Sequence, residues 1–211
     1  MIDLHTHILP GVDDGSRTLD DALDMARAAV ADGIRAVAAT PHVRDDYPTE
    51  AGRMERGVAE LRAALTEAAI PLDLLPGGEL ALDRLDLLSE SELASFGLGG
   101  NPDFLLLETP YSGWPLALPE QVRALTARGV VPVLAHPERN PDVQRDPERL
   151  RPLVLMGAVC QVTASSLDGR IGKQARRTGL ALVETGLAHL VASDAHTPDV
   201  RGIGMTDAAV A

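Results

Sequence analysis

Cysteine is almost absent from this sequence, because Cys160 is the only one among 211 residues. One cysteine cannot form a disulfide within the chain, which is typical of proteins from a reducing compartment. A cysteine-dependent phosphatase needs an arginine six residues after its nucleophile, and Ser166 occupies that position here. We therefore expect Cys160 to be a buried core residue.

Positive charge and long apolar runs are also scarce. The 19 lysine and arginine residues face 31 aspartate and glutamate residues, which gives a net charge of -12. Nucleic acids and anionic membranes bind basic surfaces, so neither is expected as a partner. No apolar run approaches the roughly 20 residues of a membrane span, and no signal peptide is recognisable. We expect a cytoplasmic protein without membrane insertion.

Two common enzyme motifs are missing as well. No G-x-G-x-x-G follows the first apolar run, which argues against dinucleotide binding, and the G-x-S-x-G of serine hydrolases does not occur. We find no linker or low-complexity tract, and 45% of the residues are hydrophobic. This composition predicts one domain that spans residues 1–211.

What the sequence does contain is an alternation of short apolar runs and helical segments. The runs are rich in Val, Leu and Ile, which is typical of strands buried on both faces of a parallel sheet. We predict seven strands, at residues 2–5, 34–39, 72–75, 104–107, 130–135, 158–162 and 189–192. Apolar spacing and capping residues predict helices at 18–31, 54–69, 83–96, 119–128, 147–156 and 172–185. The alternation indicates an α/β fold, either a seven-stranded barrel or an open doubly wound sheet.

Polar residues gather where these predicted strands end. Asp3, His5 and His7 alternate along the first strand, so their side chains share one face. The ends of the later strands carry most of the remaining histidines and several acids: His42, Glu79, Glu108, His136, Asp194 and His196. The carboxyl ends of the strands in a parallel barrel meet at one mouth, where active sites are built.

Such a cluster predicts bound metal. Gathered imidazoles and carboxylates repel one another and lose hydration, and a cation removes that penalty. Nitrogen and oxygen donors without a thiolate favour Mn, Fe or Zn. The candidate ligands are too many for one ion, so we expect two or three divalent ions: His5, His7, Asp14, His42, Glu79, Glu108, His136, Asp194 and His196. Clustered cations activate water and hold a phosphoryl group.

The only lysine argues against one related site. Many metal-dependent hydrolases with a similar first strand bridge their metals with a modified lysine. Lys173 lies in a predicted helix, and Glu108 ends the fourth strand instead. An amidohydrolase-type site is therefore not expected.

Six motifs in order carry a family resemblance: H-T-H, T-P-H, G-G-E, L-E-T-P, H-P-E-R and S-D-A-H. The sequence resembles the polymerase-and-histidinol-phosphatase (PHP) superfamily. More narrowly, MIDLHTHILPGVDDGS and LAHPERN resemble the bacterial metal-dependent protein-tyrosine phosphatases of capsule and exopolysaccharide operons. The resemblance extends from Met1 to about Met205 and implies a distorted seven-stranded TIM-like (β/α) barrel with a Mn-activated cluster of three metals.

The resemblance also implies roles for individual residues. The nine candidate ligands match family ligands, although Asp13 competes with Asp14 for one place. Asp3 matches a residue that orients a ligand. Arg139 and Arg201 match phosphate-binding positions, and a guanidinium suits a phosphate well. Asp194 and His196 are further catalytic candidates, because either could assist the leaving group through water.

The implied function is hydrolysis of phosphotyrosine on a protein, with a bacterial tyrosine kinase as the expected partner and polysaccharide synthesis as the regulated process. The alternatives are a phosphatase of small metabolites such as histidinol phosphate and a non-catalytic metal-binding regulatory module. Tyr111 and Trp114 either contact an aromatic substrate or pack their own loop, and Arg44 is an open case. Family members usually continue with a further helical segment, so a shortened C-terminus is expected and the oligomeric state stays open.

Overall fold

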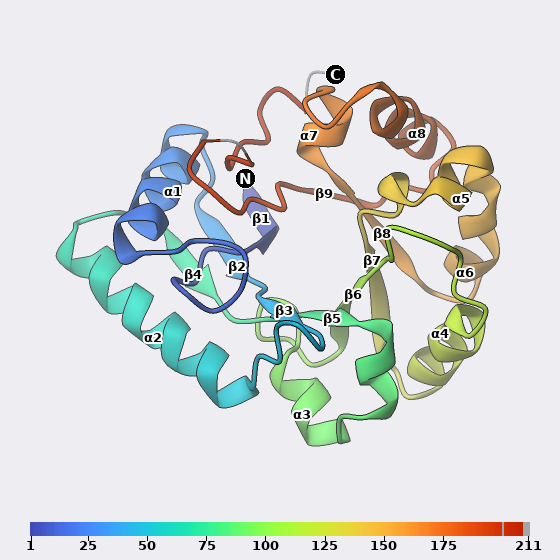
Figure 1. The fold of residues 1–211 in the computed structure, drawn as a ribbon, viewed down its shortest axis with the longest axis horizontal. Coiled ribbons are helices and arrows are strands. Elements are labelled where there is room, and N and C mark those ends of the chain that lie inside the picture. Colours follow the sequence, from blue (N-terminus) through green and yellow to red (C-terminus); the bar gives the residue numbers. More distant parts are fainter. Residues whose placement is uncertain (200, 209–211) are drawn as a thin grey trace.

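Nine parallel strands form the centre of the computed structural model, which describes residues 1–199 and 201–208. The first sheet has the order β1-β2-β4, with β1 at Ile2–Thr6, β2 at Ala36–Ala39 and β4 at Asp73–Leu75. The second sheet runs through β3 (His42–Val43), β5 (Glu79–Ala81), β6 (Phe104–Glu108), β7 (Val131–Ala135), β8 (Val159–Thr163) and β9 (Leu190–Ala192). Figure 1 shows both sheets at the centre of the ring of helices.

The two sheets are joined at the first strand. The His7 N–H donates to the Ala195 carbonyl at 2.8 Å, and the Asp194 N–H donates to the His5 carbonyl at 2.9 Å. Strand β1 therefore lies beside the segment that follows β9. Asp3 strengthens this joint, because its buried Oδ1 accepts from the Ser193 N–H at 3.0 Å.

The strand count differs from the sequence-based prediction. All seven predicted runs contain a strand, but the described residues hold nine strands in two sheets rather than seven in one. The sequence missed β3 and β5, because they are only two and three residues long and begin with the polar residues His42 and Glu79. The parallel α/β class is confirmed, whereas closure into a barrel stays a prediction.

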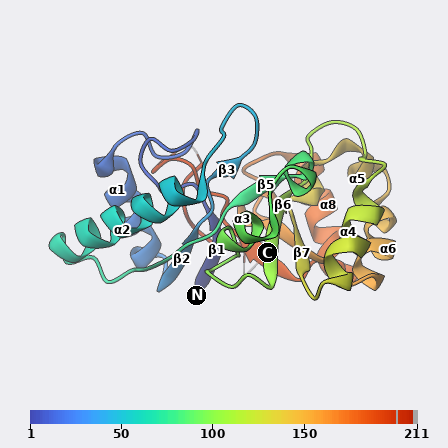
Figure 2. The same ribbon diagram turned by 90° about the horizontal axis from the view of Figure 1, so that it is seen from below.

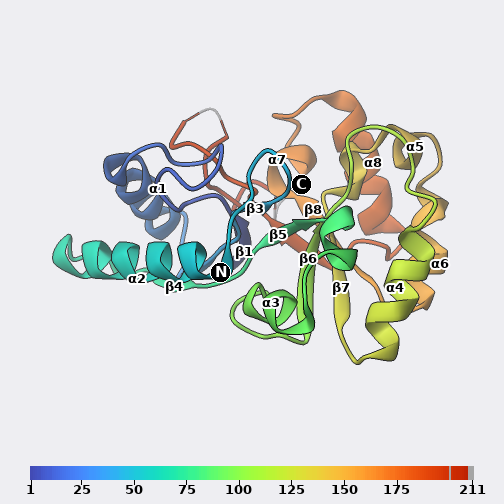
Figure 3. The same ribbon diagram turned by 60° about the horizontal axis from the view of Figure 1, so that its bottom comes forward.

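Helices cover the outside of the strands. They are α1 (Leu19–Ala31), α2 (Ala51–Glu67), α3 (Glu90–Ser95), α4 (Leu118–Ala127), α5 (Pro141–Arg145), α6 (Arg151–Leu155), α7 (Ala164–Leu167) and α8 (Lys173–Glu184). Short 3₁₀ turns occupy Leu82–Asp86, Pro137–Arg139 and Pro147–Leu150. Figures 2 and 3 show α1 and α2 on one side of the strands and α4, α5, α6 and α8 on the other. No helix in residues 1–199 and 201–208 meets the length and apolarity of a membrane span.

Two predicted helices are interrupted. The segment predicted at 83–96 divides into a 3₁₀ turn and α3, where Ser89 caps the helix by accepting from the Glu92 N–H. The segment predicted at 147–156 begins as a 3₁₀ turn and continues as α6. Pro152 lacks an N–H and therefore suits the first turn of α6. A side-chain cap at Ser89 and a proline in the first turn of α6 thus mark starts that apolar spacing alone did not show.

Both faces of the central strands are buried. Leu105 and Leu107 of β6 join the large core cluster, while the intervening Leu106 packs with Val133 and Ala135 in a smaller one. This alternation explains why the runs read as continuous apolar stretches. Cys160 is fully buried in the large cluster, and burial raises its pKa to about 12, which confirms the predicted core position.

Candidate metal centre

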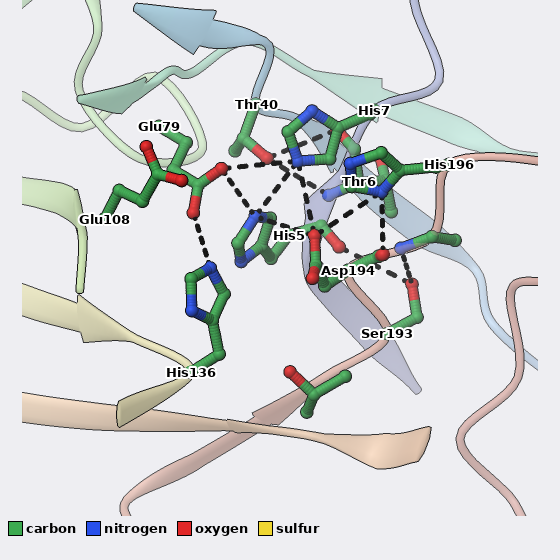
Figure 4. A network of polar contacts seen from close by, with 12 residues as sticks. His5, Thr6, His7, Thr40, Glu79, Glu108, His136, Ser193, Asp194 and His196 are labelled. Carbon is green, nitrogen blue, oxygen red and sulfur yellow. Dashed lines mark hydrogen bonds and ion pairs between the residues drawn. The ribbon is translucent and has the colours of Figure 1, made fainter. Parts of the chain in front are cut away.

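The nine predicted ligands converge on one place. Seven lie at or after the carboxyl ends of strands, whereas His42 and Glu79 are the first residues of the short strands β3 and β5, which follow β2 and β4 in the chain. Eight are buried, and the Asp14 side chain is 35% exposed. Their donor atoms form four overlapping groups, within each of which the atoms lie no more than 4.8 Å apart: His7, Asp14, His42 and His196; His5, Glu79 and His136; His5, His7 and Asp194; and His42, Glu79 and Glu108. In Figure 4, the side chains of His5, His7, Glu79, Glu108, His136, Asp194 and His196 gather around a common centre. Residues from β1, β3, β5 and β6 thus meet residues that follow β7 and β9.

Three histidines are oriented so that Nε2 faces the centre. The Asp13 carboxylate can only accept, so His7 Nδ1 donates to it at 2.7 Å. His196 Nδ1 donates to the Asp194 carbonyl at 3.0 Å, and His5 Nδ1 lies 2.9 Å from Gln161 Oε1. When these rings are neutral, the proton stays on Nδ1 and Nε2 presents a lone pair, which is how outer partners prepare imidazole ligands for metal.

Two of these Nε2 atoms lie close together in the centre. His5 Nε2 lies 3.3 Å from His7 Nε2, and Asp194 Oδ1 lies 3.3 Å from each of them. Lone pairs at this separation repel unless a proton or a cation lies between them. The donor set therefore fits a bound cation.

Buried donor atoms without hydrogen-bond partners support the same fit. Three such atoms belong to candidate ligands and have no hydrogen-bond partner among the described residues: His136 Nδ1, Asp194 Oδ1 and His196 Nε2. An orphaned buried polar atom costs about 1–3 kcal/mol. A metal ion would satisfy several of them at once.

Glu79 lies at the middle of the cluster. Its carboxylate is 2.8 Å from His136 Nε2, 2.9 Å from His42 Nδ1 and 3.4 Å from His5 Nε2. Burial opposes ionisation, but the charge of His5 and the bonds from His136 and His42 outweigh it and hold the pKa of Glu79 well below its usual range. Burial and the nearby Glu79 charge raise the pKa of Glu108.

The pKa shifts of His7 and Asp194 show that the cluster favours positive charge. Burial alone would lower the pKa of His7, yet the Asp13 carboxylate raises it well above its usual value. Burial likewise opposes ionisation of Asp194, but His5 and its other partners hold the pKa of this carboxyl well below its usual range. A cation could replace the proton on His7 and balance the charge of Asp194.

The loop between β1 and α1 separates the roles of two neighbouring aspartates. Asp13 accepts from His7 Nδ1 and, at 2.9 Å, from the His42 N–H, so it orients two ligands. Asp14 Oδ1 lies 3.4 Å from Nε2 of both His42 and His196. The geometry therefore favours Asp14 over Asp13 as the ligand. Gly15 allows the loop to fold tightly against His7.

Two site residues have left-handed backbones. His136 has φ 38° and Asp194 has φ 51°, a region that non-glycine residues seldom adopt. Such a conformation costs on the order of 1–3 kcal/mol and tends to occur at functional sites. Here it turns both side chains into the cluster directly after β7 and β9.

Both predicted arginines reach the edge of the centre. Arg139 donates to Asp194 Oδ2 at 2.6 Å and to Thr163 Oγ1 at 2.8 Å, and Arg201 donates to the same Asp194 oxygen at 2.7 Å. The Tyr111 ring stacks on His136 with centroids 5.5 Å apart, and its hydroxyl accepts from Arg139 at 3.4 Å. Two guanidinium groups and one aromatic ring thus border the cluster on one side.

Sequence reasoning missed several supporting residues. Gln161 orients the His5 ring through Nδ1, and the Thr163 hydroxyl accepts a hydrogen bond that holds the Arg139 guanidinium. The buried Glu138 carboxylate accepts from the Thr163 N–H at 3.1 Å and from the Ser166 hydroxyl at 2.6 Å. Gln161 and Thr163 lie in the last three residues of β8. Residues two apart on a strand share one face, so their spacing could have indicated that both side chains face the site.

Three further residues, His189, Arg44 and Trp114, have contacts that support the structure. His189 Nδ1 accepts from the Cys160 N–H at 3.2 Å, away from the cluster. Arg44 donates to Glu108 Oε1 at 2.8 Å, so it neutralises a candidate ligand. Trp114 is partly buried against the large core cluster, which favours packing within its loop.

Comparison with known proteins identifies close relatives. The family model described as capsular polysaccharide synthesis, CpsB/CapC, matches residues 1–211. The tyrosine-protein phosphatase YwqE of Bacillus subtilis is 40% identical over 211 residues, which are 99% of this chain and 82% of that protein. The putative tyrosine-protein phosphatase CapC of Staphylococcus aureus is 30% identical and covers 93% of this chain and 77% of its own length.

Solved structures give the same picture. A crystal structure from work on YwqE of Bacillus subtilis and CpsB of Streptococcus pneumoniae, described as unique metal-dependent tyrosine phosphatases, aligns with a TM-score of 0.90 and 38% identity. The alignment covers 99% of this chain and 84% of that one. A lactonase of Listeria monocytogenes shares the fold, with a TM-score of 0.53 and 17% identity.

Proposed function

The chain belongs to the CpsB/CapC family of capsular polysaccharide synthesis proteins, and on that premise we propose that it is a metal-dependent phosphatase that hydrolyses phosphotyrosine on proteins. The observation that carries the proposal is the convergence of nine candidate ligands, with two lone-pair nitrogens 3.3 Å apart at their centre. Regulation of polysaccharide synthesis is the process we propose for it.

We propose that the cluster holds two or three divalent ions, with manganese as the physiological metal. Imidazole and carboxylate donors without thiolate fit Mn, and also Fe or Zn. The four overlapping donor groups share His5, His7, His42 and Glu79, which supports more than one ion. When bound, such ions activate water at neutral pH and stabilise charge on the phosphoryl oxygens.

The arginines would bind the phosphate. Arg139 and Arg201 both donate to Asp194 Oδ2, so they are already held beside the cluster before a substrate arrives. Their guanidinium groups suit phosphate oxygens and would stabilise charge as it grows on them. The Tyr111 ring, which is 50% exposed, would contact the aromatic ring of the substrate.

The leaving group needs little protonation by the protein. A tyrosine phenol has a pKa near ~10, so its phenolate leaves with limited protonation. Asp194 and His196 belong to the cluster, and either would assist the leaving group by relaying a proton through water. Burial and the neighbouring His7 charge lower the pKa of His196 to about 4. Neutral His196 can then accept a hydrogen bond at neutral pH.

The test compares three substrates with the purified protein. Metal content is measured first, and turnover is then followed on a phosphotyrosine peptide, a phosphoserine peptide and histidinol phosphate, each with Mn, Fe or Zn added. We expect the phosphotyrosine peptide to be preferred and Mn to support the highest rate. Preference for histidinol phosphate would replace the tyrosine assignment with a metabolite phosphatase, and no turnover of any ester would indicate a regulatory module.

Two variants complete the test. His136→Ala removes a candidate ligand and is expected to abolish turnover and lower the metal content. Cys160→Ala is the matched control, because it removes the only thiol from the buried core and should keep full activity. Activity retained in His136→Ala would overturn the metal mechanism.

The proposed setting follows from the same premise. We propose a bacterial tyrosine kinase as the phosphotyrosine protein, a cytoplasmic location, and one phosphatase domain over residues 1–211. To test this partner, the protein is incubated with a phosphorylated tyrosine kinase from the same cell, and the loss of phosphate from its tyrosines is measured.

A further inference from the structure

A cavity of about 700 Å³ opens beside the candidate metal centre. Tyr111, Arg139 and Arg201 line it, together with Arg170 and Ile171 from the connection between α7 and α8 and with Lys173 at the start of α8. In Figure 1, this connection lies next to α8 and α5. The cavity is therefore shared by the residues proposed to bind phosphate and the start of α8.

The charge of this groove is opposite to that of the chain. All the charged side chains that line it are basic: Arg139, Arg170, Lys173 and Arg201. The whole chain has a net charge of -12 and a single lysine. A basic cavity in an acidic protein attracts anionic ligands to that place.

The four cations differ in how much charge they can offer. Arg139 and Arg201 are bound to Asp194, and Arg170 is held by Asp168, with its Nη2 2.8 Å from the carboxylate. Lys173 is exposed, and no ion pair or hydrogen bond of its ammonium group is recorded among residues 1–199 and 201–208. Its charge is available for a ligand.

The position of Lys173 is also electrostatically unfavourable for the helix that it begins. It is the first residue of α8, where the helix dipole favours acids, and the first turn of α8 contains none. Ile171 lies two residues before Lys173, and its side chain is 43% exposed. An apolar side chain beside a free cation suits a polypeptide that offers both an alkyl chain and a carboxylate.

We propose that this groove binds the polypeptide that flanks the phosphotyrosine, and that Lys173 pairs with an aspartate or glutamate of that segment. The inference rests on the proposed function and adds the sequence preference of the same site. A carboxylate is favoured over a second phosphate, because a lone lysine offers one point charge whereas phosphate suits an arginine fork. Lys173 is thus a specificity residue outside the metal centre.

The experiment uses phosphotyrosine peptides that carry glutamate or glutamine at one flanking position at a time, with 4-nitrophenyl phosphate as a substrate without flanks. Wild-type protein should show a higher kcat/KM for the peptide with glutamate at one or two neighbouring positions. We expect Lys173→Gln to remove about a twofold to fivefold preference. The glutamine peptides and 4-nitrophenyl phosphate should be turned over as before.

Charge reversal gives the sharper readout. Lys173→Glu should disfavour the glutamate peptide and favour a peptide with lysine at the same position, and salt should weaken both preferences. Arg177→Gln is the matched control, since Arg177 is exposed on the same helix and does not line the cavity. Its peptide preference should equal that of the wild type.

The outcomes separate this inference from the proposed function. A wild-type protein that turns over phosphotyrosine peptides without preference for glutamate would overturn the role of Lys173 and leave the phosphatase intact. An equal loss in Arg177→Gln would overturn it too, since the effect would then reflect net charge. Stronger preference for a second phosphotyrosine than for glutamate would contradict the carboxylate assignment. No turnover of any peptide or of 4-nitrophenyl phosphate would instead refute the proposed function.

Discussion

At the scale of single residues, Arg139 depends on several partners for its position. Its guanidinium donates to Asp194, Thr163 and the Tyr111 hydroxyl, and its side chain is only 9% exposed. Glu138 holds Thr163 in turn through the Thr163 N–H. A planar group with five donors can serve these partners and a phosphate together, whereas an ammonium cannot.

Arg139→Lys tests this dependence. We expect kcat on a phosphotyrosine peptide to fall about 10²-fold, because one positioned donor to the phosphoryl oxygens is lost. The metal content should stay the same, since no candidate ligand changes. Arg151→Lys is the control: Arg151 pairs with Glu148 on the surface, and its loss should not change the rate. Equal rates for wild type and Arg139→Lys would exclude the proposed phosphate contact.

At the scale of elements, the β1–α1 loop and the joint between β1 and the segment after β9 build the centre. The loop folds back so that the Ser16 N–H donates to the His7 carbonyl at 3.0 Å. A Cβ on Gly15 would overlap the His7 carbonyl and Cβ. The loop can therefore place Asp13 and Asp14 only if residue 15 has no side chain.

Gly15→Ala is expected to displace His7. We predict a destabilisation of about 1–3 kcal/mol from overpacking, together with a lower metal content. Gly33→Ala is the matched control, because Gly33 has φ +80° but no atom within 4 Å of an added Cβ. It should lose about 1–2 kcal/mol through backbone strain alone and keep its metal. Denaturant unfolding and metal analysis of both variants distinguish the two causes.

The joint after β9 contains a buried acid whose ionisation should affect stability. Burial raises the pKa of Asp3 to about 6, against a usual value of 3.8. Between these two values the folded protein keeps a proton that the unfolded chain has released, so stability falls as the pH rises. In the metal-free protein, we expect the stability of Asp3→Asn relative to wild type to increase by about 3 kcal/mol from pH 4 to pH 7.

Unfolding in denaturant at several pH values measures this difference. The asparagine oxygen can still accept from the Ser193 N–H, so the joint itself is preserved. A difference that stays constant over the range would show that Asp3 keeps its charge when buried.

At the scale of the whole molecule, the cluster connects both sheets. Its ligands come from β1 in the first sheet and from β3, β5, β6 and the segments after β7 and β9 in the second. Cations held by this cluster would link segments more than 180 residues apart in the sequence, such as His5 and Asp194. Metal binding should therefore stabilise the fold as a unit.

Removal of metal by a chelator is expected to lower the melting temperature. A ligand present at 100 times its Kd contributes about 2.7 kcal/mol, which is on the order of 5–10 °C for a chain of this size. Added Mn should restore the transition. The His136→Ala variant should gain less from Mn, and calorimetry with and without chelator compares the two proteins. An unchanged transition after chelation would mean that the cluster binds no metal in the folded protein.

Much of this protein could be predicted from the sequence because its signals are local. Alternating His5 and His7, and apolar runs followed by acids or histidines, each depend on neighbouring residues. They were enough for the parallel α/β class, the positions of the seven longer or more apolar strands, and the nine candidate ligands. The ligand roles themselves stay proposals until metal is measured.

Only the tertiary structure decided the rest. Whether Asp13 or Asp14 faces the centre, that Gln161 orients His5, and that Lys173 lines a groove with Arg139 depend on contacts between distant segments. The division into two sheets also depends on distant pairing, since β3 and β5 are too short to have a pattern of their own. A sequence determines which chemistry each strand end carries, but long-range packing determines which of those ends meet.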